Sequence, residues 1–109
     1  MNIKTYKNIY LVGIGGIGMS ALANYFYSQN KNVYGYDRVK STLTENLEKK
    51  GVEISYEDNI NSIPLVFNNS SKDQLVIYSS AISNNNILSY FSENSYDVCK
   101  RSKVLGLIS

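Results

Sequence analysis

The sequence predicts an α/β domain centred on a doubly wound parallel sheet of about five strands, with helices on both faces. Three observations predict this class. Short apolar runs alternate with segments of helical periodicity along the whole chain, the clearest of these runs are continuous, and a glycine-rich turn follows the first one. Continuous apolar runs are typical of strands that are buried on both faces, as they are in parallel sheets.

The first strand, helix and second strand follow from the pattern near the N-terminus. Residues 9–12 are an apolar run that ends at Gly13, which predicts a buried strand. From residue 17 to about residue 29 the apolar side chains recur at helical spacing, so we expect a helix there. Residues 33–36 then predict a second short strand, which ends at Asp37.

A second helix is predicted between a start signal and a stop signal. Thr42 and Glu45 match a capping box, in which two side chains satisfy free amides at the start of a helix. Gly51 is suited to a left-handed stop. Residues 52–56 alternate in polarity and predict the third strand.

The second half of the chain predicts two further strand and helix pairs after an irregular stretch. Residues 57–73 are the least regular, with a short helix near residues 65–67. The later elements are a strand at 75–78, a helix capped by Asn85 or Asn86 and stopped at Asn94, a strand at 96–99 and a helical pattern from Ser102. That last pattern has no stop signal, so we expect residues 1–109 to be a single domain of a longer chain.

Composition excludes several classes of function. The chain has 11 Lys and Arg against 9 Asp and Glu, and a net charge of +2 is too small to predict binding to nucleic acid or to anionic membranes. It has no histidine, which excludes histidine-based acid–base catalysis and histidine-ligated metal sites within it. One cysteine excludes an internal disulfide. With no membrane-length apolar run and no secretory signal in the sequence, we expect a cytoplasmic protein.

The strongest chemical signal is the glycine-rich turn at residues 13–18, Gly-Ile-Gly-Gly-Ile-Gly. It matches G-x-G-x-x-G in the required context, directly after a strand and opening a helix. Gly13 permits the tight turn, Gly15 lets the backbone approach a diphosphate, and Gly18 lets the helix pack close to the strand. Free amides at the helix start and the helix dipole then favour an anion. Met19 stands where a Walker A loop needs lysine, which argues against nucleotide hydrolysis.

Further candidate ligand contacts lie where other predicted strands end. Asp37 follows the second strand and suits a ribose hydroxyl, or it caps the next turn as a surface carboxylate. Arg38 beside it faces either a phosphate or solvent. The segment Ser79-Ser80-Ala81 follows the fourth strand, where hydroxyls could bind a diphosphate or sugar, or merely cap a turn. The glycine pattern together with Asp37 is typical of NAD-binding domains, although the same loop suits any nucleoside diphosphate.

Near the C-terminal end, the sequence favours structural readings. Cys99 has no histidine or second cysteine near it, which favours a structural thiol. Lys100, Arg101 and Lys103 are interpreted as a solvated face rather than a binding patch.

The residues 11–23, Leu-Val-Gly-Ile-Gly-Gly-Ile-Gly-Met-Ser-Ala-Leu-Ala, closely resemble the N-terminal segment of the UDP-N-acetylmuramate–L-alanine ligases, a group within the Mur ligase family. Residues 33–37, 78–82 and 100–105 resemble further segments of that family in the same order. The resemblance covers essentially the whole chain. It departs at Glu57-Asp58, where many members have Gly-His, and at residues 86–88, where they tend to have Asn-Pro-Glu.

The resemblance implies a Rossmann-like domain that binds the UDP part of UDP-N-acetylmuramate, with the diphosphate on the glycine loop. The site residues it implies are Gly13, Gly15, Gly16, Ile17, Gly18, Met19, Ser20, Asp37, Arg38, Ser79, Ser80 and Ala81. The family joins L-alanine to the lactyl carboxylate using ATP and Mg²⁺. Its ATP loop, metal ligands and amino-acid pocket belong to central and C-terminal domains, so we expect this chain to hold no catalytic residue, metal or cofactor and to be inactive alone.

Two alternatives remain open at this point. One is an NAD(H)-binding Rossmann domain, either of an oxidoreductase or of a regulatory sensor. The other is the related ligase that recycles murein tripeptide, but its loop usually departs from the Gly-Ile-Gly-Gly-Ile-Gly found here.

Overall fold

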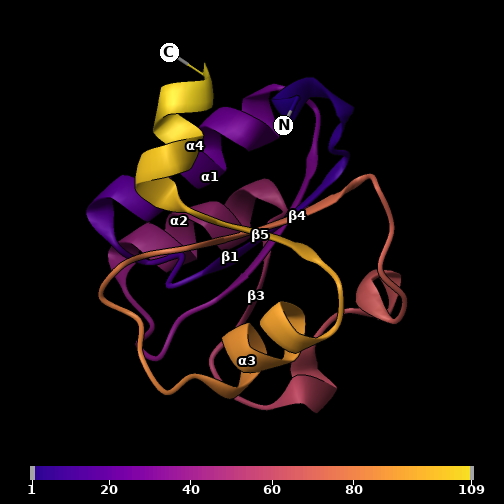
Figure 1. Cartoon of the computed structure of the whole chain (residues 1–109). Helices are drawn as coiled ribbons and strands as arrows, with labels where there is room; N and C mark the ends of the chain where they lie inside the picture. Colours follow the sequence, from indigo (N-terminus) through magenta and orange to yellow (C-terminus); the bar gives the residue numbers. More distant parts are fainter. Residues whose placement is uncertain (1, 109) are drawn as a thin grey trace.

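Five parallel strands form the centre of the molecule in the order β3-β2-β1-β4-β5 (Figure 1). The structure is a computed structural model that describes residues 2–108. The strands are β1 (Asn8–Val12), β2 (Asn32–Tyr36), β3 (Glu53–Ser55), β4 (Gln74–Tyr78) and β5 (Asp97–Lys100). The chain moves outward from β1 to β3 and then crosses back to β4 on the other side of β1. The doubly wound parallel sheet predicted from the sequence is therefore confirmed.

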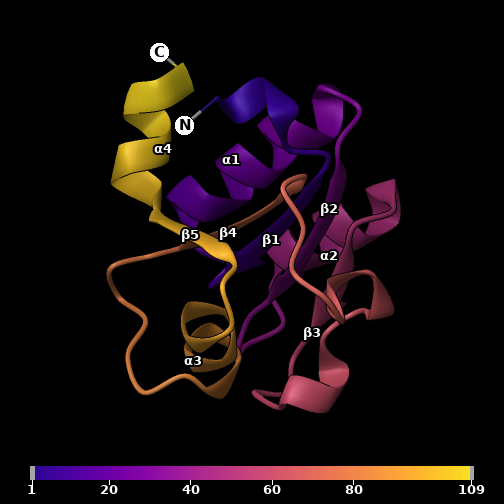
Figure 2. The same ribbon diagram turned by 45° about the vertical axis from the view of Figure 1, so that its right-hand side comes forward.

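Helices cover both faces of this sheet (Figures 1 and 2). The α-helices are α1 (Ile17–Ser28), α2 (Thr42–Lys50), α3 (Asn86–Glu93) and α4 (Arg101–Ile108), and the 3₁₀ turns are η1 (Ile3–Thr5), η2 (Ile60–Ser62) and η3 (Leu65–Phe67). Side chains from α1, α2 and α4 belong to one buried cluster, and side chains from α3 and η3 belong to another. The two clusters lie on opposite faces because successive residues of a strand point in opposite directions.

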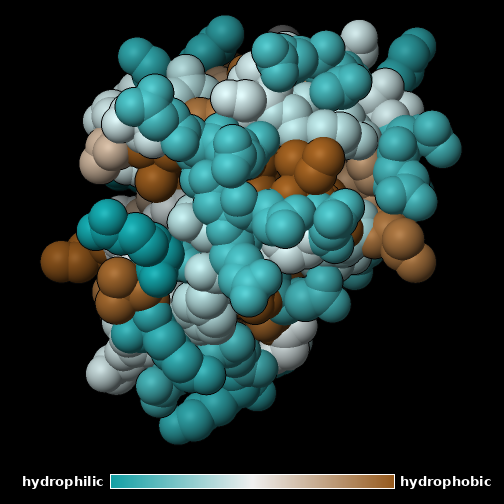
Figure 3. Space-filling model, turned by 90° about the horizontal axis from the view of Figure 1, so that it is seen from below, coloured by the Kyte–Doolittle hydropathy of each residue, from teal (hydrophilic) through white to brown (hydrophobic). Residues whose placement is uncertain are grey.

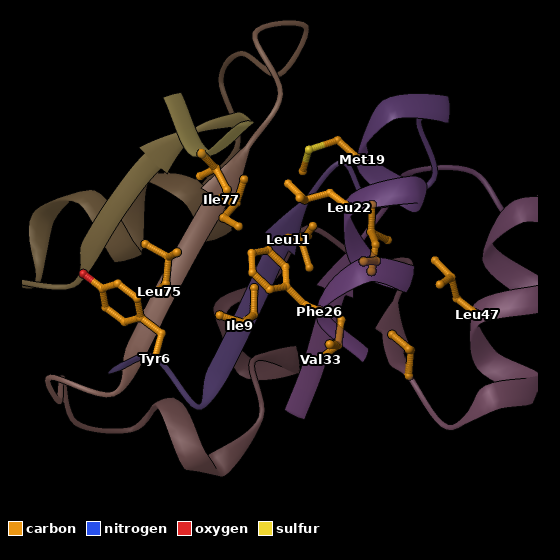
Figure 4. Close-up of a cluster of buried hydrophobic side chains, with 14 of the residues drawn as sticks. Tyr6, Ile9, Leu11, Met19, Leu22, Phe26, Val33, Leu47, Leu75 and Ile77 are labelled. Atoms are coloured by element: carbon orange, nitrogen blue, oxygen red, sulfur yellow. The ribbon is translucent and has the colours of Figure 1, made fainter. Parts of the chain in front are cut away.

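The central strand β1 shows this division most clearly, since all five of its residues are buried. Ile9 and Leu11 pack against α1, and Figure 4 shows Leu22 and Phe26 of that helix directed toward them. Tyr10, on the opposite face, packs in the second cluster. A strand buried on both faces needs apolar residues at every position, which is why its sequence is a continuous run.

Most predicted elements lie within one or two residues of those observed, but the start of α2 was predicted one residue too late. The capping box is formed by Ser41 and Thr44, not by Thr42 and Glu45. The Ser41 hydroxyl accepts a hydrogen bond from the Thr44 amide, and the Thr44 hydroxyl accepts one from the Ser41 amide. The left-handed stop at Gly51 is confirmed by its φ of 114°.

The aromatic cluster beneath α3 contains one polar defect. The Tyr10 side chain is fully buried between Phe67 and Phe91, and its hydroxyl has no hydrogen-bond partner within residues 2–108. The Tyr96 hydroxyl, in the same cluster, donates a hydrogen bond to the Phe67 carbonyl. A buried hydroxyl without a partner keeps its desolvation penalty, so the hydroxyl of Tyr10 should lower the stability of the fold and that of Tyr96 should raise it.

Replacing Tyr10 with Phe is expected to raise the free energy of unfolding by about 1 kcal/mol, because the substitution removes an unpaired buried hydroxyl and keeps the ring. Tyr96→Phe, the matched control, is expected to lower it by about 1–2 kcal/mol, because the Phe67 carbonyl loses its donor. Urea unfolding followed by circular dichroism measures both. A clear loss of stability in Tyr10→Phe would show that the hydroxyl is hydrogen-bonded after all.

Candidate functional site

The glycine loop, residues 13–16, joins the end of β1 to the start of α1 at the reversal of strand order. The amides of Gly13 and Ile14 both donate to the Tyr36 carbonyl at the end of β2, at 2.8 and 3.0 Å. Gly13 adopts a φ of +88°, which favours glycine. Crevices at such a reversal, beyond the carboxyl ends of the strands, are where open α/β sheets bind ligands.

Packing against the sheet also fixes the loop. The Ile14 side chain is fully buried and lies on Gly35 of β2. A Cβ atom on Gly35 would lie 2.5 Å from Ile14 Cδ1 and 2.8 Å from the Leu11 carbonyl oxygen. The absence of a side chain at Gly35 therefore makes room for Ile14, and Ile14 anchors the loop to the sheet.

The first turn of α1 presents amides that nothing in the described chain satisfies. Gly16 is the N-cap and supplies no capping side chain, and the first turn holds no acidic residue. The amides of Ile17, Gly18 and Met19 have no intrahelical acceptor, because they belong to the first turn of the helix. Together with the helix dipole they favour an anion at this end of α1. The Ile17 side chain beside them is 84% exposed.

Met19 and Ser20, which were predicted to take part in the site, direct their side chains away from it. Both side chains are buried under the helix. The Ser20 amide donates to the Gly16 carbonyl at 2.7 Å, and its hydroxyl donates to the Ile17 carbonyl at 3.1 Å. Met19 can therefore offer only its amide to a ligand, while the donors of Ser20 stabilise the start of the helix.

Asp37 connects the glycine loop to the loop after β2. One carboxylate oxygen accepts from the Gly15 amide at 2.8 Å, and the other accepts from the Val39 amide at 3.0 Å. A Cβ atom on Gly15 would lie 2.8 Å from the nearer oxygen, so glycine is needed for this contact. The predicted bond from Asp37 to a ribose hydroxyl stays a prediction, and each oxygen keeps a lone pair for it.

A cleft of about 700 Å³ opens beside this carboxylate, beyond the ends of the central strands. It brings together three of the predicted site residues, Asp37, Arg38 and Ala81. The other lining residues are Tyr36, Val39, Tyr56, Asp58, Ile82, Ser83, Asn84 and Asn85. Burial and the nearby Asp58 and Asp37 raise the pKa of Tyr36, so its hydroxyl is a neutral donor at pH 7.

Ser79 and Ser80 lie outside the lining of this cleft. The Ser79 hydroxyl accepts from the Ala81 amide at 3.2 Å, which is the turn-capping alternative considered from the sequence. Ser79 also lies beneath the glycine loop, where a Cβ atom on Gly13 would be 3.7 Å from the Ser79 Cβ. Ser80 is exposed. Their predicted contacts with a ligand stay predictions.

Asp58 has a role that sequence reasoning did not find. Its carboxylate accepts from the amides of Asn86 and Ile87 in the first turn of α3, at 2.8 and 3.0 Å, and its carbonyl accepts from the Asn86 side chain at 3.1 Å. Asn85, one of the two caps predicted, is the N-cap of α3 and accepts from the Leu88 amide. In this chain the N-terminus of α3 is therefore satisfied by the protein itself.

Arg101 was predicted to lie on a solvated face with Lys100 and Lys103, but it is partly buried. Lys100 and Lys103 are exposed, whereas the Arg101 guanidinium is packed on Gly18. The third glycine of the motif was expected to let helix and strand pack closely, and here the space it leaves is taken by Arg101. The one sequence signal for this role is that Arg101 directly follows β5, at the carboxyl edge of the sheet. Burial also raises the pKa of the thiol of Cys99 in β5.

Across residues 2–108, no group of three or more histidine, cysteine, aspartate or glutamate side chains is arranged to hold a metal ion. Nor is any helix in the same range long and apolar enough to cross a membrane.

Comparisons with known proteins agree on one family. A family profile described as "Mur ligase family, catalytic domain" matches residues 8–109. The UDP-N-acetylmuramate–L-alanine ligase of Porphyromonas gingivalis W83 is 45% identical over 104 residues, covering 94% of this chain and 23% of the relative. That of Flavobacterium johnsoniae is 46% identical, covering 100% of this chain and 24% of the relative. The chain thus spans about a quarter of these relatives.

A solved structure supports the same grouping. The crystal structure of UDP-N-acetylmuramate-alanine ligase MurC from Thermotoga maritima superposes with a TM-score of 0.77 at 27% identity, covering 90% of this chain and 21% of that one.

Gly35→Ala is expected to lower the free energy of unfolding by about 1–3 kcal/mol, because the added methyl group would overlap Ile14 and the Leu11 carbonyl. Gly106→Ala is the matched control. A Cβ at that position of α4 meets nothing within 4 Å, so we expect a gain of up to about 1 kcal/mol from helix propensity. Thermal unfolding of both variants is the measurement. Equal stability of Gly35→Ala and the unmodified protein would refute the packing argument.

Proposed function

The chain belongs to the Mur ligase family, and from this premise we propose that it is the UDP-binding, N-terminal domain of a UDP-N-acetylmuramate–L-alanine ligase. Identities of 45% and 46% to ligases of that name support the assignment. Since the chain spans about a quarter of those relatives, the central ATP-binding domain and the C-terminal domain would belong to the rest of the protein.

The observation that carries this proposal is the set of free amides at the start of α1, held at the reversal of strand order. Ile17, Gly18 and Met19 can donate to phosphate oxygens, and the loop before them is fixed by Ile14. A diphosphate spreads its charge over several oxygens and can accept from several amides at once. Gly16 leaves open space for its approach, whereas the spaces beside Gly15 and Gly18 are taken by the Asp37 and Arg101 side chains.

The nucleoside half of the ligand would occupy the cleft beside Asp37. Its volume of about 700 Å³ is within the range of pockets that hold small ligands. Asp37 lines the cleft and also accepts a hydrogen bond from the Gly15 amide of the glycine loop. One residue would thus connect the part of the site for the nucleoside with the part for the diphosphate. Arg38 and Ala81 would complete the walls, with Ser79 and Ser80 behind them.

The chemical step would be performed outside this chain. Joining L-alanine to a lactyl carboxylate requires activation of that carboxylate, for which the family uses ATP and Mg²⁺. The residues described here do not fit those groups, because the loop has Met19 in place of a phosphate-binding lysine and no metal-binding cluster occurs in residues 2–108. The role proposed for this chain is to hold the UDP end while the carboxylate reaches the other domains.

The nicotinamide-binding alternative is disfavoured by the relatives, which are named as ligases rather than oxidoreductases. The glycine loop alone does not separate the two, because both ligands carry a diphosphate joined to a nucleoside. The discrimination therefore has to come from ligand binding.

Isothermal titration of the chain with UDP-N-acetylmuramate, UDP and NADH tests the proposal. We expect both UDP ligands to bind and NADH not to bind, and a micromolar affinity would correspond to about −8 kcal/mol. Binding of NADH without UDP would restore the nicotinamide reading. Absence of all binding would mean that the site requires the remaining domains, and the full-length ligase would then be titrated.

Gly15→Val is expected to weaken UDP-N-acetylmuramate binding by about tenfold or more while the domain stays folded. The new side chain would displace the Asp37 carboxylate, press on Thr44 Cγ2 and block the approach to the loop, but the nearest atoms all belong to side chains rather than to the backbone. Gly106→Val, which meets no neighbour, is the control and should bind as the unmodified chain does. A folded Gly15→Val variant with unchanged affinity would refute the role of the loop.

A further inference from the structure

Arg101 is a cation placed where the backbone is already positive. Its guanidinium lies on Gly18, where a Cβ atom would be 2.8 Å from Nη1 and 2.9 Å from Cζ. Gly18 is the second residue of α1, in the turn whose amides are free. A cation at the N-terminal end of a helix is opposed by the helix dipole, so this placement is unfavourable by itself.

Nothing within the described chain neutralises this charge. Over residues 2–108 the single salt bridge joins Lys40 and Glu48, and the Arg101 guanidinium donates no hydrogen bond there. The first turn of α1 contains no acidic side chain. Asp37, the carboxylate on the loop, is engaged with the Gly15 and Val39 amides.

Arginine presents its donors in a planar fork that matches phosphate oxygens. We propose that Arg101 contacts the diphosphate from the β5 side, opposite Asp37. The inference rests on the proposed function, since it takes the anion to be a nucleoside diphosphate. Gly18 then serves to admit the guanidinium, and Arg101 becomes the one charged side chain on the phosphate.

Arg101→Gln distinguishes this role from a structural one. If Arg101 binds the anion, the variant should bind UDP about tenfold or more weakly, because charge-assisted hydrogen bonds are lost. Its thermal stability should be unchanged or higher, since a cation is removed from the helix N-terminus. The affinity of Arg101→Lys for UDP should lie between those of Arg101→Gln and the unmodified chain. Lys103→Gln, an exposed cation on the same helix, is the control and should bind as the unmodified chain does.

Failure of the inference and failure of the proposed function give different results in this titration. Normal UDP binding by the unmodified chain and equal binding by Arg101→Gln would overturn the role of Arg101 alone. So would a loss of stability that parallels the loss of affinity, since that result would make Arg101 structural. No UDP binding by the full-length ligase that carries this chain would overturn the proposed function and the inference with it.

Discussion

The contact between Ile14 and Gly35 is the constraint on which the site depends. It buries a side chain of the glycine loop in the sheet and so anchors the loop there. The bonds from two loop amides to the Tyr36 carbonyl then set the direction in which α1 begins. The first turn of α1 is thereby placed at the reversal of strand order, and its free amides form an array held by the sheet.

Each group of backbone amides around the start of α1 has a separate role. The amides of Gly13 and Ile14 hold the loop to β2, and that of Gly15 is taken by Asp37. The amides after the N-cap are those that remain for an anion. The charges follow the same division, with Asp37 on the β2 side and Arg101 on the β5 side of the helix start. A ligand that is anionic at one end and rich in hydroxyls at the other suits this arrangement.

The sequence predicted the elements whose signals are local and missed the contacts that depend on distant residues. The glycine loop and a cap at Asn85 or Asn86 were predicted because motif and neighbours lie within a few positions, and the structure places the cap at Asn85. The start of α2 was one residue off, since Ser41 and Thr42 are both good caps and only the backbone decides between them. Asp58 and Arg101 were missed because each acts on a helix far away along the chain, and no local pattern records such a partner.

The three hydrogen bonds that Asp58 accepts from the start of α3 have a consequence for the cleft. They join the segment after β3 to the helix after β4. Both segments contribute residues to the lining of the cleft, Asp58 from the first and the N-cap Asn85 from the second. The entropy of ordering these segments is lost during folding and not on binding. The shape of this end of the cleft is therefore set before a ligand arrives, and the binding proposed for it would select by shape rather than by closure around the ligand.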